Sequence, residues 1–356
     1  MRAALISAVA LVMLLPAAPA RAAAAADLFI DYGNAPSVLR YQGGDGQANN
    51  VQLSRRGDEL LVQDVVPLAV GAGCRRDGAA NRAVCNWAFT AHFVLGDNDD
   101  RFDARPASGA PPLTVEGGDG ADTVFGGDGP DTIHGNPGGD QLYGMAGNDT
   151  LLSCNPIGPN NCRSDPDTDR LLGGWGNDTV TASRGDWVWG DDGEDNLTGA
   201  SFIDGGRGHD RLETGFGEMF GGDGDDYLAA WGDSGVRIEA GDGGDRVDGS
   251  DGPDEIVAGP GGGHIWANGG DDTVWGGPGP DWIFGMEGND LLMGGDGDDE
   301  VSGGQGYNDR VFGGAGRDRL SGHHTANSFT SDQIDGGPGV EYYCINANFV
   351  INCEDS

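Results

Sequence analysis

The chain has 356 residues, of which 68 are glycine and 58 are Asp or Glu, and its formal net charge at pH 7 is −38. The 20 basic residues are all arginine and form no basic stripe, which excludes nucleic acid and anionic membrane surfaces as expected partners. So acidic and glycine-rich a composition is typical of a disordered chain, unless an external cation supplies the missing stabilisation. The placement of the glycines distinguishes these two interpretations.

Residues 1–26 have the three-part pattern of a secretory signal peptide. Arg2 precedes an apolar run over residues 3–15, and a segment of small residues with Pro16 and Ala20 follows. The apolar run is too short for a membrane span, which needs about 20 residues. We therefore expect residues 1–26 to be removed on export, the mature chain to be secreted, and no membrane span to remain.

Six cysteines in an exported chain predict disulfide bonds. They form three pairs of sequence neighbours, which are Cys74 with Cys85, Cys154 with Cys162, and Cys344 with Cys353. The sequence alone does not choose among the pairings that six thiols allow, although an elongated fold favours local pairs. A zinc site is the rival interpretation, but no pair has CxxC spacing and no His stands at ligand spacing nearby.

Residues 27–95 differ in texture from the rest of the chain. Segments 58–70 and 87–96 have the composition of β-strands, and Cys74 and Cys85 bracket a loop between them. We expect this region to form an N-terminal β cap, because a repetitive fold needs ends that hide its core from water. A separately folded domain over the same residues is the alternative.

A nine-residue period with the pattern G-G-x-G-x-D-x-U-x, in which U is aliphatic, occupies residues 96–343. Glycines at positions 1, 2 and 4 permit a tight turn that directs carbonyl oxygens toward one point, and the Asp at position 6 adds a carboxylate oxygen. Such oxygens are the ligands that Ca²⁺ prefers. The x-U-x remainder is a short strand with its middle side chain inward. The predicted inward residues are Val124, Ile133, Leu142, Leu151, Val274, Ile283, Leu292, Val301, Val311 and Leu320.

These repeats resemble the hemolysin-type, or RTX, calcium-binding repeat proteins over roughly residues 96–344. The resemblance implies an all-β fold, a right-handed parallel β-roll in which two nonapeptides make one turn. It also implies multiple Ca²⁺ ions as cofactors, each between the loops of units n and n+2, and folding on calcium binding. The implied metal ligands are Asp122, Asp131, Asp140, Asp149, Asp178, Asp195, Asp210, Asp226, Asp245, Asp254, Asp272, Asp281, Asp290, Asp299, Asp309 and Asp318.

The same rule of n and n+2 pairs the aspartates of the regular units. The implied pairs are Asp122 with Asp140, Asp131 with Asp149, Asp272 with Asp290, Asp281 with Asp299, Asp290 with Asp309, and Asp299 with Asp318. In one unit Gly263 stands where the Asp is expected, which puts that site in doubt.

Between residues 173 and 257 full units alternate with degenerate ones. If each pair of units still makes one coil, the full loops stack on one edge of the roll. We expect a continuous calcium ladder there, through Asp131, Asp149, Asp178, Asp195, Asp210, Asp226 and Asp245. The other edge would carry tight, mostly metal-free turns and regain its ladder at Asp254 and Asp272.

The remaining features bear on the end of the chain and on catalysis. Residues 344–356 are expected to form a disulfide-closed C-terminal cap. The six His are scattered without an HExxH pattern, and the chain has no GxSxG elbow and no phosphate-binding loop in a βαβ context. The sequence therefore predicts a secreted, monomeric calcium-binding protein that is not an enzyme.

Two other functions stay open. An adhesin or matrix module would hold a cell-surface, glycan or matrix partner through a row of aromatic residues, for which packing at the corners between coils is the competing explanation. The row consists of Phe125, Tyr143, Trp266, Trp275, Phe284 and Phe312 at position 9, and Trp282 at position 7. A fragment of an RTX enzyme or toxin is the third interpretation.

Overall fold

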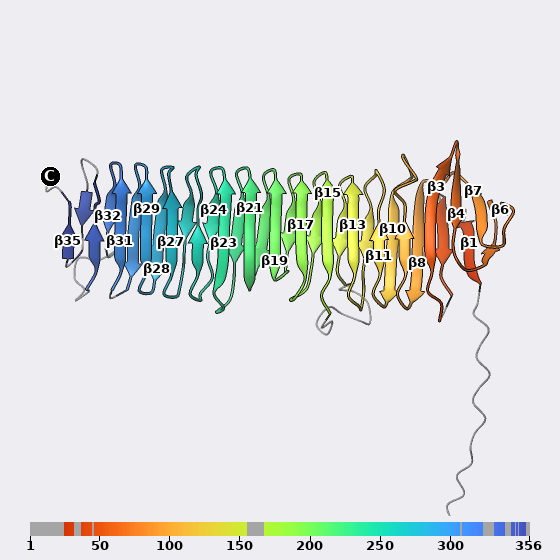
Figure 1. Cartoon of the computed structure of the whole chain (residues 1–356), viewed down its shortest axis with the longest axis horizontal. Coiled ribbons are helices and arrows are strands. Elements are labelled where there is room, and N and C mark those ends of the chain that lie inside the picture. The colour runs from red at the N-terminus through yellow and green to blue at the C-terminus, as the bar shows by residue number, and fades with distance from the viewer. Residues whose placement is uncertain are drawn as a thin grey trace, which may run out of the picture.

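The computed structural model describes residues 25–31, 37–44, 46–154, 167–306, 308–322, 331–338, 343–345, 347 and 349–353. The regular elements of these residues are all β-strands, which stack into one elongated tube of two facing sheets (Figure 1). Across the described ranges no helix is long and apolar enough to cross a membrane. The tube is the all-β parallel roll that the repeats predicted.

Sheet A contains β1 (Ala26–Asp31), β2 (Val38–Gln42), β5 (Leu68–Val70), β8 (Thr90–Asp97), β10 (Leu113–Asp119), β12 (Thr132–His134), β14 (Thr150–Leu152), β16 (Thr179–Thr181), β18 (Asn196–Thr198), β20 (Arg211–Thr214), β22 (Tyr227–Ala230), β24 (Arg246–Asp248), β26 (His264–Trp266), β28 (Trp282–Glu287), β30 (Glu300–Gln305), β32 (Arg319–Ser321) and β34 (Tyr343–Ile345).

Sheet B contains β3 (Asn50–Arg56), β4 (Glu59–Gln63), β6 (Cys74–Arg76), β7 (Arg82–Asn86), β9 (Arg101–Asp103), β11 (Thr123–Phe125), β13 (Gln141–Ala146), β15 (Arg170–Trp175), β17 (Trp187–Asp192), β19 (Phe202–Arg207), β21 (Gly217–Asp223), β23 (Val236–Asp242), β25 (Glu255–Val257), β27 (Thr273–Gly277), β29 (Leu291–Asp296), β31 (Arg310–Ala315), β33 (Gln333–Asp335) and β35 (Phe349–Ile351).

From β8 onward the chain alternates between the two sheets, so each strand pairs in parallel with the strand two places on. The register joins equal repeat positions of successive coils. Val124 lies opposite Leu142 in sheet B, and Ile133 lies opposite Leu151 in sheet A. One coil therefore contains two repeat units, as the resemblance implied.

The core is a pair of aliphatic columns between the sheets. Each short strand turns its middle side chain inward and its two neighbours outward, because side chains alternate along a strand. All the aliphatic residues predicted to point inward have exposed fractions of at most 1%. The columns continue through the irregular coils as Leu171, Val180, Val188, Leu197, Ile203, Leu212, Met219, Leu228, Ile238 and Val247. The predicted core is confirmed.

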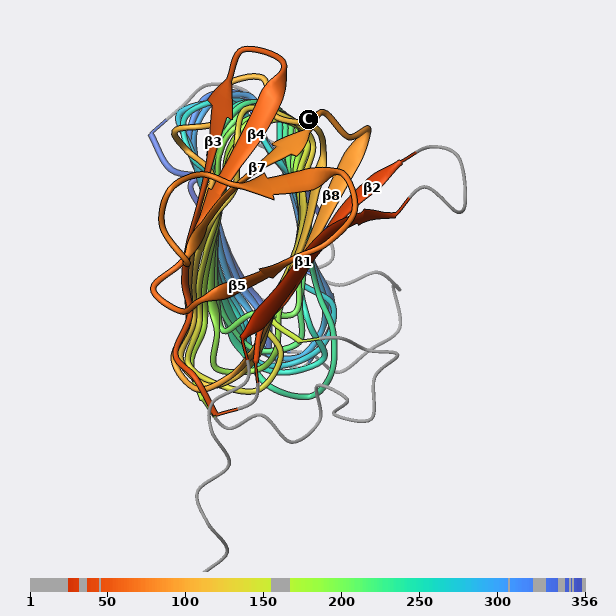
Figure 2. The same cartoon turned by 90° about the vertical axis from the view of Figure 1, so that its right-hand side faces the viewer.

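The roll begins earlier than residue 96. β2 pairs in parallel with β8, and β3 pairs in parallel with β9, so residues 38–56 already form a coil under the repeats. The antiparallel pairs β1–β2, β3–β4 and β4–β7 fold the chain back over this coil. Figure 2 shows β1 and β5 crossing the end of the tube. The expected boundary between residues 95 and 96 falls inside β8, where the sheet is continuous.

The N-terminal region shares its core with the roll. Tyr41 and Phe93 stack with ring centroids 5.7 Å apart, and Phe93 lies 4.6 Å from Phe102. Tyr41 belongs to β2, Phe93 to β8 and Phe102 to β9, so the aromatic contacts join the first coil to the second. Residues 27–95 are therefore not a domain with a separate core.

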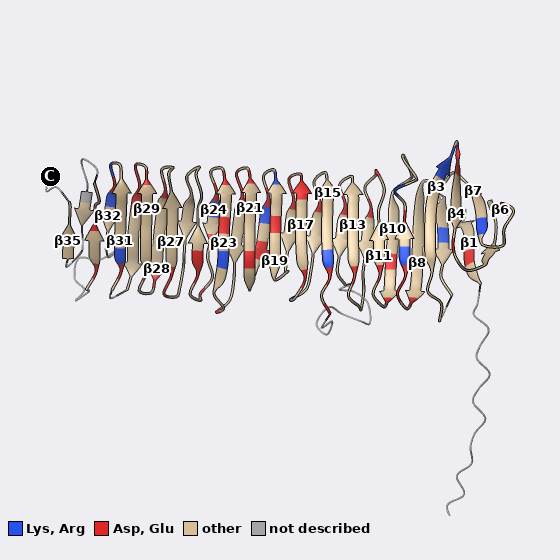
Figure 3. Cartoon of the chain, in the orientation of Figure 1, with Lys and Arg blue, Asp and Glu red and all other residues tan. Residues whose placement is uncertain are grey.

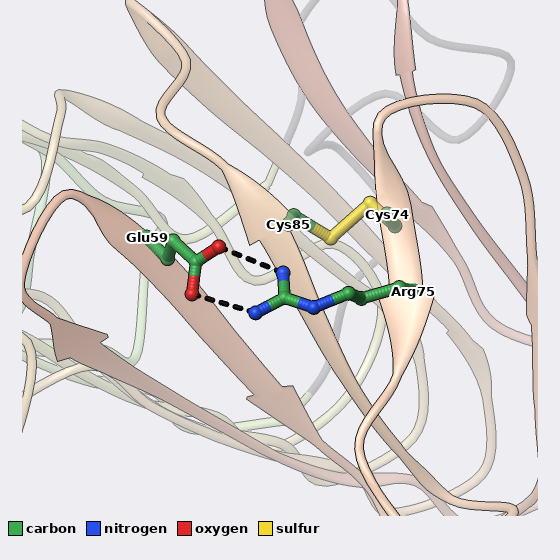
Figure 4. Close-up of a disulfide and its surroundings, with 4 residues drawn as sticks. All are labelled: Glu59, Cys74, Arg75 and Cys85. Carbon is green, nitrogen blue, oxygen red and sulfur yellow. Dashed lines mark hydrogen bonds and ion pairs between the residues drawn. A yellow bond between two sulfur atoms is a disulfide. The ribbon is translucent and has the colours of Figure 1, made fainter.

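Two of the three expected disulfides are described. The Cys74–Cys85 bond joins opposite residues of β6 and β7, and beside it Arg75 donates hydrogen bonds of 2.7 and 2.9 Å to Glu59 (Figure 4). Cys344 is bonded to Cys353. Cys154 is also disulfide-bonded, and its expected partner, Cys162, lies outside the described residues. β34 and β35 extend both sheets by one more coil, so the C-terminal segment continues the roll.

The narrow core makes each inward residue important. Leu197 of β18 is fully buried, and its replacement in Leu197→Ala would leave a cavity that the two sheets cannot close. We expect a loss of about 2–5 kcal/mol in the free energy of unfolding, measured by urea denaturation in calcium. Asn196→Ala, on the same strand but facing outward, should change it by less than about 0.5 kcal/mol. Equal losses in the two variants would contradict this account of the core.

Candidate calcium sites

The position-6 aspartates lie in the two rows of turns that join the sheets, which Figure 3 shows as acidic along their length. We call the column that precedes the strands of sheet A the A-edge ladder, and the column that precedes those of sheet B the B-edge ladder. The A-edge ladder consists of Asp131, Asp149, Asp178, Asp195, Asp210, Asp226, Asp245, Asp281, Asp299 and Asp318. The B-edge ladder consists of Asp100, Asp122, Asp140, Asp169, Asp186, Asp254, Asp272, Asp290, Asp309 and Asp332.

Successive aspartates of a ladder are joined by hydrogen bonds. The backbone N–H of Asp131 donates to Oδ1 of Asp149, one coil later, over 2.8 Å. All six pairs obtained from the rule of n and n+2 are joined in this way, over 2.8–3.1 Å. One oxygen of each carboxylate is therefore used in stacking the coils, and the other is left for a different partner.

The second oxygen faces a small space beside the first glycine of its own unit. A Cβ atom on Gly205 would lie 2.5 Å from Oδ2 of Asp210 and 2.5 Å from the carbonyl oxygen of Gly221, one coil later. The same two kinds of oxygen meet beside Gly144, Gly173, Gly190, Gly294 and Gly313. Glycine at position 1 leaves open the space on which these oxygens converge, although Ala240 and Ala267 stand at this position in the units of Asp245 and Asp272.

Many of these Oδ2 atoms are buried and accept no hydrogen bond from the described residues. They belong to Asp100, Asp122, Asp149, Asp178, Asp195, Asp210, Asp226, Asp272, Asp281, Asp290, Asp299, Asp318 and Asp332. A buried charged group without a partner is costly. A row of such oxygens facing backbone carbonyls is the donor set of a hard divalent cation, and Ca²⁺ fits it.

The remaining ligands at such a site would be backbone carbonyls. No group of three or more His, Cys, Asp or Glu side chains suited to a metal occurs in the described part of the chain. A site made mainly from side chains, such as a zinc centre, is therefore not seen there. The carbonyl-rich turn is the arrangement that the glycine positions predicted.

Burial raises the pKa of the ladder carboxyls. The pKa of Asp149 rises to about 6. The pKa of Asp178 rises to about 7, because the charges of Asp149 and Asp195 add to the effect of burial. The pKa of Asp272 rises to about 8 for the same reasons, with Asp290 and Asp254 as the neighbouring charges. The charged form of these groups is therefore disfavoured unless a cation lies beside them.

The two ladders are interrupted in different places. The A-edge ladder is continuous from Asp131 to Asp245 and breaks only at Gly263, whose N–H donates to Asp281 Oδ1 over 2.6 Å. In the B-edge ladder Ser201, Gly217 and Val236 take the aspartate position in successive coils. Asp254 then resumes it and accepts the N–H of Val236 over 2.8 Å. Full loops and short turns thus lie on opposite edges between residues 173 and 257.

Sequence reasoning missed several ladder members. Asp100, Asp186 and Asp332 were not assigned, because their turns lack the glycines or follow an insertion. A triplet of Asp-x-aliphatic or Asp-x-aromatic still marks these positions. It ends at Phe102 for Asp100, at Val188 for Asp186 and at Ile334 for Asp332. A ten-residue unit from Gly43 to Gln52 was also missed, since Asn49 stands in place of its Asp.

Asn49 ends the B-edge ladder without a carboxylate. Its backbone N–H donates to Asp100 Oδ1 over 2.5 Å, as a ladder aspartate would. Its side-chain Nδ2 donates to the carbonyl oxygen of Leu95 over 2.8 Å, and its Oδ1 accepts the Tyr41 hydroxyl over 3.0 Å. In the regular units the corresponding carbonyl oxygen faces a carboxylate oxygen. Here the Leu95 carbonyl instead accepts the side-chain amide N–H of Asn49, so no cation is needed between these two groups.

The expected aromatic row is not a single row. Phe125, Tyr143, Trp275 and Phe312 lie on the outer face of sheet B, whereas Trp266, Phe284 and Trp282 lie on that of sheet A. These residues divide between two faces because consecutive units alternate between the sheets. Neighbours on one face stack between coils, with Phe125 and Tyr143 4.5 Å apart. Arginines cover part of these rings, such as Arg246 over Trp266 at 4.7 Å. The rings thus lie on flat faces and not at the corners.

The raised pKa values predict a pH dependence for the calcium-free protein. A folded-state pKa above the unfolded value of about 4 stabilises the fold at low pH, and the contribution is lost as the pH rises through the folded-state pKa. Because the folded-state pKa is about 6 for Asp149 and about 8 for Asp272, this stabilisation is lost between about pH 4 and 8. In chelator, circular dichroism should show more β structure at pH 5 than at pH 8. The opposite order would contradict the burial of these carboxyls.

The comparison with known proteins agrees with this geometry. The family model of the RTX calcium-binding nonapeptide repeat matches residues 116–151, 165–186, 172–204, 239–274, 248–283, 266–301, 275–308 and 303–340. These segments together cover half of the chain. No curated protein matches the chain in sequence. The chain belongs to the RTX calcium-binding nonapeptide repeat family.

Proposed function

We propose that the protein is a secreted calcium-binding β-roll that folds when Ca²⁺ binds and that catalyses no reaction. The observation that carries this proposal is the row of buried Oδ2 atoms that accept no hydrogen bond from the described residues, such as those of Asp178 and Asp299. Each faces a site that exists only when successive coils are stacked. Metal binding to a site that the unfolded chain lacks contributes its free energy to folding.

The composition supports the same coupling. The chain has a net charge of −38, and its core holds about one aliphatic side chain per repeat unit. Repulsion between the ladder carboxylates therefore opposes a core that is too thin to overcome it. Bound Ca²⁺ removes the repulsion and supplies the attraction, so order is expected only where calcium is abundant.

The disulfides support an extracellular location. Cys74–Cys85 and Cys344–Cys353 lie at the two ends of the described roll, where fewer coils hold the chain in place. Such bonds persist in oxidising compartments and are rare in the cytosol. Calcium sites of extracellular modules commonly have dissociation constants of about 10⁻⁴–10⁻³ M, which would keep the chain unfolded before export.

Calcium titration followed by circular dichroism tests the proposal. The mature protein should change from a largely unfolded spectrum in chelator to a β spectrum in millimolar Ca²⁺, because the ladder carboxylates need a cation to be buried. Asp299→Asn removes a ladder carboxylate that is 2% exposed and should shift the midpoint to higher calcium. The matched control Asp296→Asn, exposed in the same turn, removes the same charge and should leave the midpoint near that of the wild type. Identical spectra in chelator and in calcium would reject the coupling of folding to calcium.

Asn49 provides a gain-of-site test. Asn49→Asp would place a carboxylate oxygen opposite the Leu95 carbonyl, in the arrangement of the regular units. We expect native mass spectrometry in calcium to show one additional ion relative to the wild type. Asn49→Ala, which removes the amide without adding a carboxylate, should show no additional ion. An unchanged ion count in Asn49→Asp would contradict the role given to the position-6 carboxylate.

A further inference from the structure

A groove of about 820 Å³ lies along the outer side of the A-edge turns, and none of the ladder aspartates lines it. Tyr143 and Met145 of β13 line it together with Leu172 and Trp175 of β15, the strand that pairs with β13. Trp175 is 68% exposed, which is more than any other tryptophan of the described residues. The ladder aspartates, by contrast, are buried on the inner side of the same turns.

The register places an apolar stretch between acidic ends. Trp175 lies beside Ala146 of the preceding coil and Asp192 of the following coil. Asp128 occupies the equivalent position one coil before Ala146. Met145 and Asp191 add side chains at position 2, where most units have glycine, with φ values of 84° and 73°. The groove therefore has an aromatic and thioether centre with carboxylates on both sides.

Arg207, the arginine among the described residues that line the groove, does not offset this charge. Arg207 lies 3.2 Å from Asp192 and 3.8 Å from Asp223, so its guanidinium is already shared between two carboxylates. Asp128 and Asp191 have no arginine partner among the salt bridges of the described residues. From the described residues, Asp128 accepts the Ser108 hydroxyl over 2.7 Å. The lining is therefore negative at both ends, and it favours a cationic ligand.

The spacing of the carboxylates defines the shape of that ligand. Asp128 and Asp191, the two groove carboxylates without an arginine partner among the described residues, are three coils apart, which at a strand spacing of about 4.8 Å is about 14 Å. An extended peptide advances about 3.3 Å per residue, so two basic residues four positions apart span this distance. An apolar side chain between them would lie over Trp175 and Met145.

We propose that the groove binds an extended peptide segment of a partner protein, with an apolar residue flanked by basic residues. Guanidinium groups of the segment would pair with the carboxylates at either end, and such charge-assisted contacts can be bidentate. A basic side chain can also lie over the open indole face of Trp175. The proposal rests on the roll being folded, but on none of the ladder carboxylates.

Fluorescence anisotropy of the full chain in saturating CaCl₂ tests the proposal. The probe is a fluorescein-labelled peptide Arg-Gly-Phe-Gly-Arg, and the matched probe Glu-Gly-Phe-Gly-Glu reverses its charge. The basic probe should bind and the acidic probe should not. Trp175→Ala should weaken binding by about tenfold, as expected for loss of a central aromatic contact. Asp128→Asn should weaken it less and reduce its dependence on salt.

Trp282→Ala is the matched control, because Trp282 is 49% exposed but lies on sheet A, away from the groove. It should bind the basic probe as the wild type does. Equal binding of the two probes, no binding of either, or loss of binding in Trp282→Ala alone would overturn the proposal. Binding of neutral cellohexaose that depends on Trp175, without binding of the basic probe, would make the groove a glycan site and would also overturn it.

The calcium response of Trp175→Ala separates this proposal from the preceding one. Its circular dichroism should change with calcium as in the wild type, since the A-edge ladder is intact. If the wild-type protein binds the basic probe but shows no calcium transition, calcium-coupled folding is rejected and the groove proposal stands. A normal transition without peptide binding would reject the groove alone.

Discussion

The structure depends on the burial of one carboxylate in each full turn. Oδ1 of each ladder aspartate accepts an N–H of the preceding coil, while Oδ2 meets a carbonyl oxygen beside a glycine, as at Asp210 and Gly205. Hydrogen bonding to a carboxylate favours its charged form, but desolvation and like charges disfavour it. The raised pKa values show that desolvation and repulsion dominate without a cation. A cation between the coils reverses this balance, so the fold and the ligand are not separable.

The two edges can differ in their turns because each coil contains two repeat units, one turn on each edge. Each coil has one turn on each edge, and the A-edge carries full loops through the irregular region while Ser201, Gly217 and Val236 shorten the B-edge. The coils remain in register because both sheets keep their aliphatic columns. One continuous ladder is therefore compatible with a stacked roll, since parallel strand pairing holds the edge that lacks carboxylates. At the N-terminal end of the B-edge, the side-chain amide of Asn49 bonds to the Leu95 carbonyl in place of a carboxylate.

The outer surface varies where the inner positions do not. Positions 1, 6 and 8 face packed neighbours, so glycine, aspartate and an aliphatic residue recur there. Positions 2, 3, 7 and 9 face outward and carry the differences between coils, such as Trp175, Asp191 and Trp282. A solenoid brings these positions into columns about 4.8 Å apart, and so creates surfaces that extend over several coils. The groove beside Trp175 is built in this way.

The sequence by itself determined the roll, because two regular nine-residue units make one coil and so bring each aspartate and each aliphatic residue onto the same position of the next coil. Leu142, Leu151 and Asp149 could be placed from the period alone. Only the tertiary structure decided which sheet each unit joins, and this divided the aromatic residues between two faces. It also assigned Asp100 and Asn49 to a ladder, since strand pairing defines those coils where a turn glycine or the aspartate itself is replaced. The groove could not be predicted for a similar reason: Asp128, Trp175 and Asp192 come into one column only through the coil register around the insertion after Cys154.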